Sequence, residues 1–182
     1  MLKFYFYLWF NWSIRLTLTT LLYSIVFASI VTFYIYFKQG FPAFNDEVNN
    51  ALLSIWQFWF LTLGNVALLV ALFSGMKYIF NHCYNGYSLE LYSCEDIKVR
   101  EKIEDVGYGD LVKVWRKWFM LIIWLTGVQM IFSLAISTII GIHESVFVWF
   151  NSLILYGFIL ISGYFSFIIL SAKSKKIRLS IC

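Results

Sequence analysis

Long uncharged apolar stretches alternate with short polar segments along the chain. Four stretches, at residues 16–37, 51–73, 118–140 and 146–170, contain no Asp, Glu, Lys, Arg or His. Each is long enough to cross the hydrocarbon core of a bilayer, which requires about 20 mostly apolar residues. None shows strand-length alternation, and helices satisfy the backbone polar groups that lipid cannot solvate. The pattern therefore predicts an all-α integral membrane protein, with four transmembrane helices in a single domain.

Composition narrows the class of protein further. Of the 182 residues, 61% are hydrophobic and 13% are charged, whereas a soluble domain carries about 25% charged residues. The 19 Phe, 12 Tyr and 8 Trp exceed what a small core could bury. A soluble helical bundle would also need a polar face on each helix, and these stretches are apolar all round. A secreted disulfide scaffold, a disordered tail and an ordinary soluble enzyme are excluded.

Basic residues fall almost entirely on one side of the predicted helices. Thirteen of the 14 Lys and Arg residues lie before the first helix, in the central segment 74–117 or in the C-terminal tail, and only Lys38 lies in a loop on the other side. Cytoplasmic segments of inner-membrane proteins collect Lys and Arg. We therefore expect both termini and segment 74–117 to be cytoplasmic, and the loops at 38–50 and 141–145 to face outward.

The N-terminal aromatic segment makes the first apolar run longer than a bilayer needs. The run continues from Phe4 to Phe37, broken only by polar residues and Arg15. A helix of this length would reach about 50 Å, whereas the hydrocarbon core is about 30 Å thick. It also exceeds the roughly 7–15 apolar residues of a signal peptide, which favours an uncleaved anchor. We expect Phe4–Trp12 to lie in the membrane interface and the chain to turn inward near Arg15.

Segment 74–117 predicts a hairpin near its start. Asn85-Gly86 is a strong signal for a two-residue turn between antiparallel strands. In the second flank, Tyr87, Leu89 and Leu91 alternate with polar residues, as in a half-buried strand. The first flank could equally be the fraying end of the second helix.

The rest of this segment predicts helix. Ser93, followed three residues later by Asp96, resembles a capping box that opens a helix over about 94–106. After the glycines that end it, Asp110 is expected to cap a helix that continues into the third span. The segment balances seven bases with seven acids, so the formal charge of +4 does not indicate nucleic-acid binding. The excess charge lies in the tail at Lys173–Arg178, where anionic lipid headgroups would attract it.

Three cysteines, Cys83, Cys94 and Cys182, all fall on the expected cytoplasmic side. Thiols there stay reduced, so no structural disulfide is expected. A zinc site could draw on His82, Cys83 and Cys94, but three ligands at this spacing are a weak signal. We predict no metal site and no cofactor.

Small residues at every fourth position mark surfaces where transmembrane helices approach closely. Matching these positions by depth pairs the first span with the third near the outer side, and the second with the fourth near the cytoplasm. The predicted packing residues are Ser24, Ala28 and Thr32 in the first span, Ser133, Ser137 and Gly141 in the third, Ala67, Ala71 and Gly75 in the second, and Ser162 and Ser166 in the fourth.

Two amides, Asn65 and Gln129, lie deep in the second and third spans, about 12 and 16 Å from their inner ends. They could hydrogen-bond to each other and stabilise the helix pair. They could instead line a polar path in an oligomeric transport or channel subunit. The spans hold no carboxylate, His or basic residue, which ion-coupled transporters usually need, and no matching interrupted helices. The structural role is therefore favoured.

No catalytic constellation is visible in the sequence, since Gly107-Tyr108-Gly109 lacks the features of a phosphate loop. Tyrosine-rich surfaces with mixed charge suit protein contacts better than catalysis. The candidate partner-binding surface of the central segment consists of Tyr84, Tyr87, Tyr92, Arg100, Glu104, Tyr108 and Asp110.

These features favour a small, non-enzymatic protein of the bacterial inner membrane that binds and modulates another membrane protein, or itself as a homo-oligomer. An accessory subunit of an envelope machine, or a protective factor such as an immunity protein or one that blocks conjugation, would fit by size and topology. The abundance of Phe, Tyr, Met, Ile, Asn and Lys, which use AT-rich codons, is typical of a low-GC genome or of an AT-rich mobile element in a bacterium. The alternatives are the transport subunit and a membrane enzyme that uses His82 or Cys83.

Overall fold

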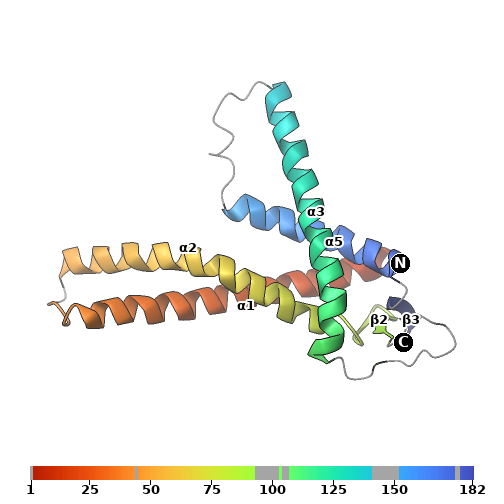
Figure 1. The fold of residues 1–182 in the computed structure, drawn as a ribbon, viewed down its shortest axis with the longest axis horizontal. Helices are drawn as coiled ribbons and strands as arrows, with labels where there is room; N and C mark the ends of the chain where they lie inside the picture. The colour runs from red at the N-terminus through yellow and green to blue at the C-terminus, as the bar shows by residue number, and fades with distance from the viewer. Residues whose placement is uncertain (1, 44, 93–102, 104–106, 141–151, 175–176) are drawn as a thin grey trace. The chain divides into compact units, whose positions relative to one another are not determined.

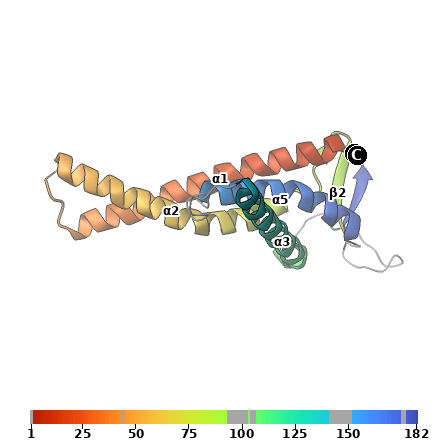
Figure 2. The ribbon, with the colours of Figure 1, turned by 90° about the horizontal axis from the view of Figure 1, so that it is seen from above.

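The computed structural model describes residues 2–43, 45–92, 103, 107–140, 152–174 and 177–182. This part of the chain is mostly helical, with one small sheet (Figures 1 and 2). The elements are α1 (Leu2–Lys38), α2 (Asp46–Lys77), β1 (Cys83–Tyr84), β2 (Tyr87–Leu91), α3 (Tyr108–Ile140), α5 (Ser152–Lys173) and β3 (Ile177–Ile181).

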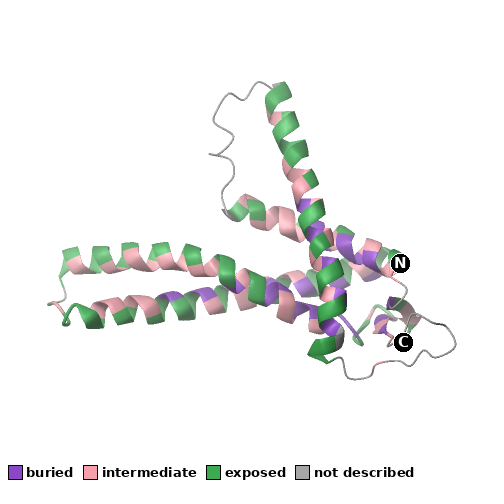
Figure 3. Ribbon diagram, viewed as in Figure 1, coloured by how far each residue is buried: buried purple, intermediate pink, exposed green. Residues whose placement is uncertain are grey.

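Four helices are long and apolar enough to cross a membrane, as the sequence predicts. Helices α1, α2 and α3 begin before their predicted spans, and α5 ends beyond its predicted span. Residues 146–151 of the predicted fourth span lie outside the described part. Only 11–28% of the most apolar window in each helix is buried within the protein, and exposed and half-buried residues run along all four helices (Figure 3). Such surfaces are unsuited to water and suited to lipid. The four helices are therefore candidate membrane spans.

The chain divides into two compact units. A helical-hairpin unit contains Trp12–Gly75, and a sheet-bearing unit contains Met1–Asn11 and Met76–Cys182. In the helical-hairpin unit, α1 and α2 run side by side in opposite directions (Figures 1 and 2). Gly40 and Phe41 adopt positive φ angles of 75° and 53° in the connection between them, which is the left-handed conformation typical of a chain reversal.

Helix α1 corrects the prediction for the N-terminal segment. It runs without a break through Arg15, so the expected turn there is wrong. The stretch from Leu2 to Lys38 contains no Gly or Pro, and nothing interrupts its i→i−4 hydrogen bonds. Hydroxyls bond back along the helix as well, as Thr17 Oγ1 does to the carbonyl of Ser13 at 2.8 Å. Its 37 residues extend about 55 Å, so part of α1 must tilt or lie beyond the hydrocarbon core.

The predicted hairpin is confirmed. Strands β1 and β2 pair with Tyr84 opposite Tyr87, and Asn85 and Gly86 have φ angles of 51° and 81°. Two consecutive positive φ angles define the type I′ turn that suits the twist of paired strands. Leu89 and Leu91 are buried, as the alternation predicts.

The C-terminal tail does not end as a free basic segment. Residues Ile177–Ile181 form β3, which pairs antiparallel with β2 and adds a three-stranded sheet to the predicted all-α fold. The pairing places Arg178 opposite Glu90 and Ser180 opposite Ser88, whose hydroxyls lie 2.8 Å apart. Opposite charges and matched hydroxyls facing each other stabilise a strand pair. Arg178 therefore has a place in the sheet while its side chain stays exposed, and the lipid contact of the tail stays a prediction.

The core of the sheet-bearing unit lies between α3 and α5 and beneath the sheet. Trp118 of α3 and Phe167 of α5 are buried, and their rings stack with centroids 5.9 Å apart. The start of α1 joins this unit through Phe4, which meets Tyr87 edge-on at 6.1 Å. Tyr5 also contributes, since its hydroxyl lies 2.6 Å from that of Ser171.

A disulfide that the sequence did not lead us to expect links the hairpin to the end of the chain. Cys83 in β1 and Cys182 after β3 are bonded, with Cα atoms 6.2 Å apart and a sequence separation of 99. The sheet brings the two residues together, because Cys83 pairs with Ser88 and Ser88 pairs with Ser180. Cys94 lies outside the described residues.

Candidate functional site

A buried polar cluster joins α3 to α5. The Ser162 hydroxyl accepts a hydrogen bond from Gln129 Nε2 at 2.8 Å and lies 3.0 Å from Thr126 Oγ1. Ser162 is fully buried and Thr126 is nearly so. Thr126 and Gln129 occupy adjacent positions on the same helical face, which lets one hydroxyl on α5 meet both. In lipid such a cluster stabilises a helix pair, because water is absent as an alternative partner.

Asn65 has a different environment. Its side chain is exposed on α2, where Nδ2 donates to the Leu61 carbonyl of the same helix at 3.1 Å. That carbonyl already accepts a bond within the helix. Asn65 therefore keeps a second N–H and a carbonyl oxygen for another partner. The Asn65–Gln129 pair stays a prediction, since the two residues belong to different units.

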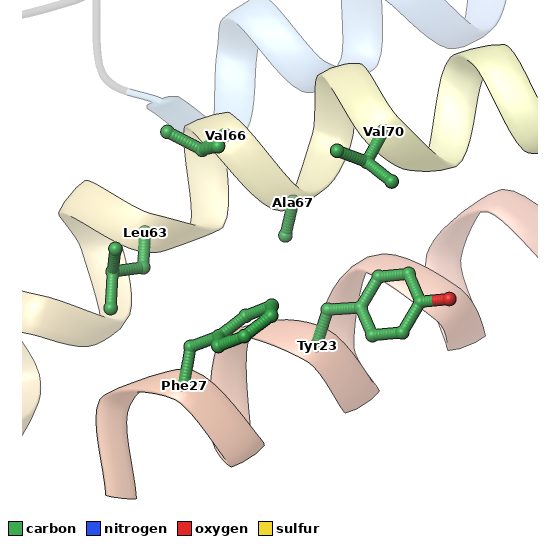
Figure 4. Close-up of a pocket in the computed structure, with 6 residues that line it drawn as sticks. All are labelled: Tyr23, Phe27, Leu63, Val66, Ala67 and Val70. Carbon is green, nitrogen blue, oxygen red and sulfur yellow. The ribbon is translucent and has the colours of Figure 1, made fainter. Parts of the chain in front are cut away.

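A cavity of about 440 Å³ lies between the two helices of the helical-hairpin unit. Tyr23 and Phe27 of α1 face α2 across it (Figure 4). The opposite wall comes from Leu63, Val66, Ala67 and Val70. The lining is almost wholly apolar, so the cavity could hold hydrocarbon but offers nothing that would orient a polar substrate.

The predicted packing residues differ in how far they are buried. Ser24, Ala28, Ala67, Ala71, Ser162 and Ser166 are buried, and a side chain added at Gly75 would touch Trp12 at 3.5 Å. Thr32 and Ser137 are half-buried, Ser133 is exposed, and Gly141 lies outside the described residues.

The helices that meet through these residues are consecutive in the chain. A Cβ at Gly64 of α2 would lie 3.3 Å from Ser24 Oγ of α1, and Ser162 of α5 bonds to α3. The small residues Ser24 and Ser162 therefore contact α2 and α3, whereas the pairings by depth join helices of different units and stay a prediction. Gly64 was missed because it precedes Ala67 by three positions, not four, although both spacings place residues on one face.

The tyrosines of the predicted partner-binding surface lie in two places. Tyr84, Tyr87 and Tyr92 are half-buried in or beside the sheet, and the Tyr92 hydroxyl donates to Glu90 Oε2 at 3.0 Å. Tyr108 is exposed at the start of α3, with Lys77 Nζ 5.5 Å from its ring centre. Arg100 and Glu104 lie outside the described residues. Asp110 lies within the first turn of α3, three positions after the capping position, and its side chain is not described.

The residues of the alternative enzyme prediction are engaged in structural contacts. His82 Nδ1 lies 3.0 Å from the Phe80 carbonyl. Cys83 is bonded to Cys182, so it offers no thiolate to a metal or a substrate in this state. In the described ranges, no group of three His, Cys, Asp or Glu residues could hold a metal ion.

We expect a double-mutant cycle to detect the Gln129–Ser162 hydrogen bond as a coupling energy between the two residues. Gln129→Leu and Ser162→Ala each remove it, so the double variant should lose less stability than the sum of the singles, by about 0.6–1.7 kcal/mol. Unfolding in mixed detergent micelles measures the difference. The matched control is Gln129→Leu with Ser137→Ala, because the Ser137 hydroxyl bonds only within α3 at 2.8 Å. Strict additivity of the first pair would contradict the prediction.

Comparison of the chain with protein-family models, curated proteins and solved structures finds no match to any of the three.

Proposed function

We propose that the protein is a non-enzymatic membrane protein that binds another membrane protein through the exposed face of α2 around Asn65. The observation that carries the proposal is the Asn65 amide, which is exposed within a candidate transmembrane helix. An amide with unused donors and acceptors is costly in hydrocarbon. A hydrogen bond to a partner helix removes that cost.

The surroundings of Asn65 support helix binding. Phe58, Leu61, Asn65 and Leu69 recur at spacings of three or four residues, so they form one stripe along α2, and all four are exposed. A single polar residue within an apolar stripe fixes the register of helix pairing, because any other alignment leaves the polar group without a partner. The stripe thus offers a partner helix an apolar surface and also favours one alignment of the two helices.

A transport function has less support. It requires Asn65 and Gln129 to line one polar path, yet Gln129 Nε2 is held by Ser162. The Gln129 amide is committed to joining α3 with α5, whereas the Asn65 amide faces outward. We therefore assign the two amides different roles, the first in folding and the second in binding.

The cellular role follows from this binding. We favour an accessory subunit of an envelope machine or a protective factor, such as one that blocks conjugation or confers immunity, in the bacterial inner membrane. The distribution of basic residues supports an orientation with both termini in the cytoplasm. In either role the protein acts by occupying a surface of its partner.

Asn65→Leu should abolish recovery of the partner while leaving the amount of protein in the membrane unchanged. Leucine keeps the stripe apolar and removes only the hydrogen-bonding group, so the loss should reach tenfold or more, as about 1.4 kcal/mol predicts. The measurement is crosslinking in native membranes, followed by affinity purification and identification of bound membrane proteins.

The matched control is Asn50→Leu, which makes the same change at an exposed position near the start of α2. It should leave the partner bound. Recovery of only a second copy of this chain would replace the proposal with homo-oligomerisation. Equal recovery by wild type and Asn65→Leu would reject the role of Asn65.

A further inference from the structure

The Cys83–Cys182 disulfide lies at the end of the sheet where β3 finishes. Cys83 and Cys182 are both exposed residues, so the bond joins two positions at the protein surface. The bond connects β1, the first strand after α2 in the chain, with the residue that follows β3. It is the one covalent link between the tail and the hairpin among the described residues.

Noncovalent contacts hold the rest of β3 and weaken toward its end. Ile177 is buried opposite Leu91, whereas Ile181, opposite Tyr87, is 83% exposed. Beyond the ladder, the Cys182 N–H donates to the Gly86 carbonyl at 3.1 Å. Strand ends with exposed side chains open readily. The disulfide therefore holds the C-terminal end of β3, which is the least buried part of the strand.

The charge pattern predicts that the same end of the protein lies in a reducing compartment. Thirteen of the 14 basic residues lie on the side that carries both cysteines, which indicates the cytoplasm. Disulfides in the cytoplasm are usually transient and redox-sensing, not permanent. A bond that is exposed, joins distant segments and faces the cytoplasm has the features of a reversible link.

We propose that Cys83 and Cys182 form a redox-controlled link that fastens the C-terminal strand to the hairpin. In the reducing step, a cytoplasmic dithiol attacks the bond, the S–S bond breaks and two S–H bonds form. The dithiol supplies two electrons and two protons and becomes a disulfide itself. In the oxidising step, a disulfide reagent accepts the same electrons and protons. Reduction leaves the end of β3 held by its ladder alone, and opening of that end then exposes the edge of β2.

The state of the sulfurs is tested in the full-length protein with Cys94→Ser, which leaves only this pair. Growing cells are quenched in acid, and free thiols are tagged with a maleimide that adds a large mass. We expect two tags at rest, none after treatment with the thiol oxidant diamide, and two again after dithiothreitol. Two tags after diamide, or a crosslinked dimer, would show that the pair does not form and would overturn the proposal.

A disulfide that stays oxidised in growing cells would also decide against the proposal. A pair that is untagged at rest and resists dithiothreitol in the folded protein is a permanent disulfide and rejects redox control. Labelling of intact cells with an impermeant maleimide then identifies the side. Tagging of these thiols after brief external reduction would place the sheet outside the cytoplasm and reverse the predicted orientation.

Hydrogen exchange tests the effect on the strand. In lipid nanodiscs, amides of residues 179–181 should exchange about tenfold faster in the reduced than in the oxidised protein. The amides of Tyr87 and Ser88, which pair with β1, should change less. Cys83→Ser with Cys94→Ser should exchange at the reduced rate under both conditions. The same exchange rate before and after reduction would show that the bond does not hold the strand.

Discussion

Trp118→Ala is expected to destabilise the α3–α5 pair by about 3 kcal/mol. Trp118 is fully buried, and its ring stacks on Phe167 with the two planes 15° apart. Removing a buried Trp from a soluble core costs about 3–5 kcal/mol through lost contacts and the cavity left behind. The lower end applies in a membrane, because lipid solvates apolar groups in the separated helices.

The control for this variant lies on the same helix. Trp124 is 70% exposed, so Trp124→Ala removes an identical side chain that is not buried in the protein interior. Unfolding by a denaturing detergent should show a large shift for Trp118→Ala and almost none for Trp124→Ala. Equal shifts would mean that α3 does not present Trp118 to the protein interior.

The contrast between these two tryptophans shows what the sequence could predict. Uncharged runs of sufficient length identify the four helices, because lipid excludes charge whatever the helix packs against. The inner face of such a helix is harder to find, since both faces are apolar and hydropathy does not distinguish them. Trp118 and Trp124 look alike in the sequence, and only tertiary contacts separate them.

The sheet shows a second limit. The hairpin was predictable because Asn85-Gly86 determines its turn locally. Strand β3 also carries a period of two, with Ile177, Leu179 and Ile181 alternating with polar residues. The lysines that precede it are typical of a charged tail beside the membrane, and they favour that interpretation over a strand. The Cys83–Cys182 bond could not be inferred from spacing, because a separation of 99 residues says nothing about proximity until β3 is placed beside β2.

Gly64 is the position where a close approach of two helices should be most sensitive to substitution. It lies within α2, and a Cβ there would be 3.3 Å from the Ser24 hydroxyl. Ser24 cannot readily move, since it is buried and donates to the Thr20 carbonyl at 2.7 Å. The pattern of small residues on α2 thus serves packing against α1, with Gly64 at the tightest point.

Gly64→Leu is therefore expected to destabilise the helical-hairpin unit by about 1–3 kcal/mol through overpacking. Hydrogen exchange along α1 and α2, together with unfolding in detergent, measures the loss. Ser24→Gly removes the obstructing hydroxymethyl group, so adding it to Gly64→Leu should restore part of the stability. That recovery would assign the loss to this contact and not to the helix backbone.

The matched control is Gly127→Leu in α3, where an added Cβ meets nothing within 4 Å. Both substitutions replace a glycine within a candidate transmembrane helix, and both gain about 1 kcal/mol of helix propensity. Any effect of propensity or added hydrophobicity is thus shared, and only the steric effect differs. Gly127→Leu should be neutral or mildly stabilising while Gly64→Leu loses stability, and the same response from both would show that α1 does not approach α2 at Gly64.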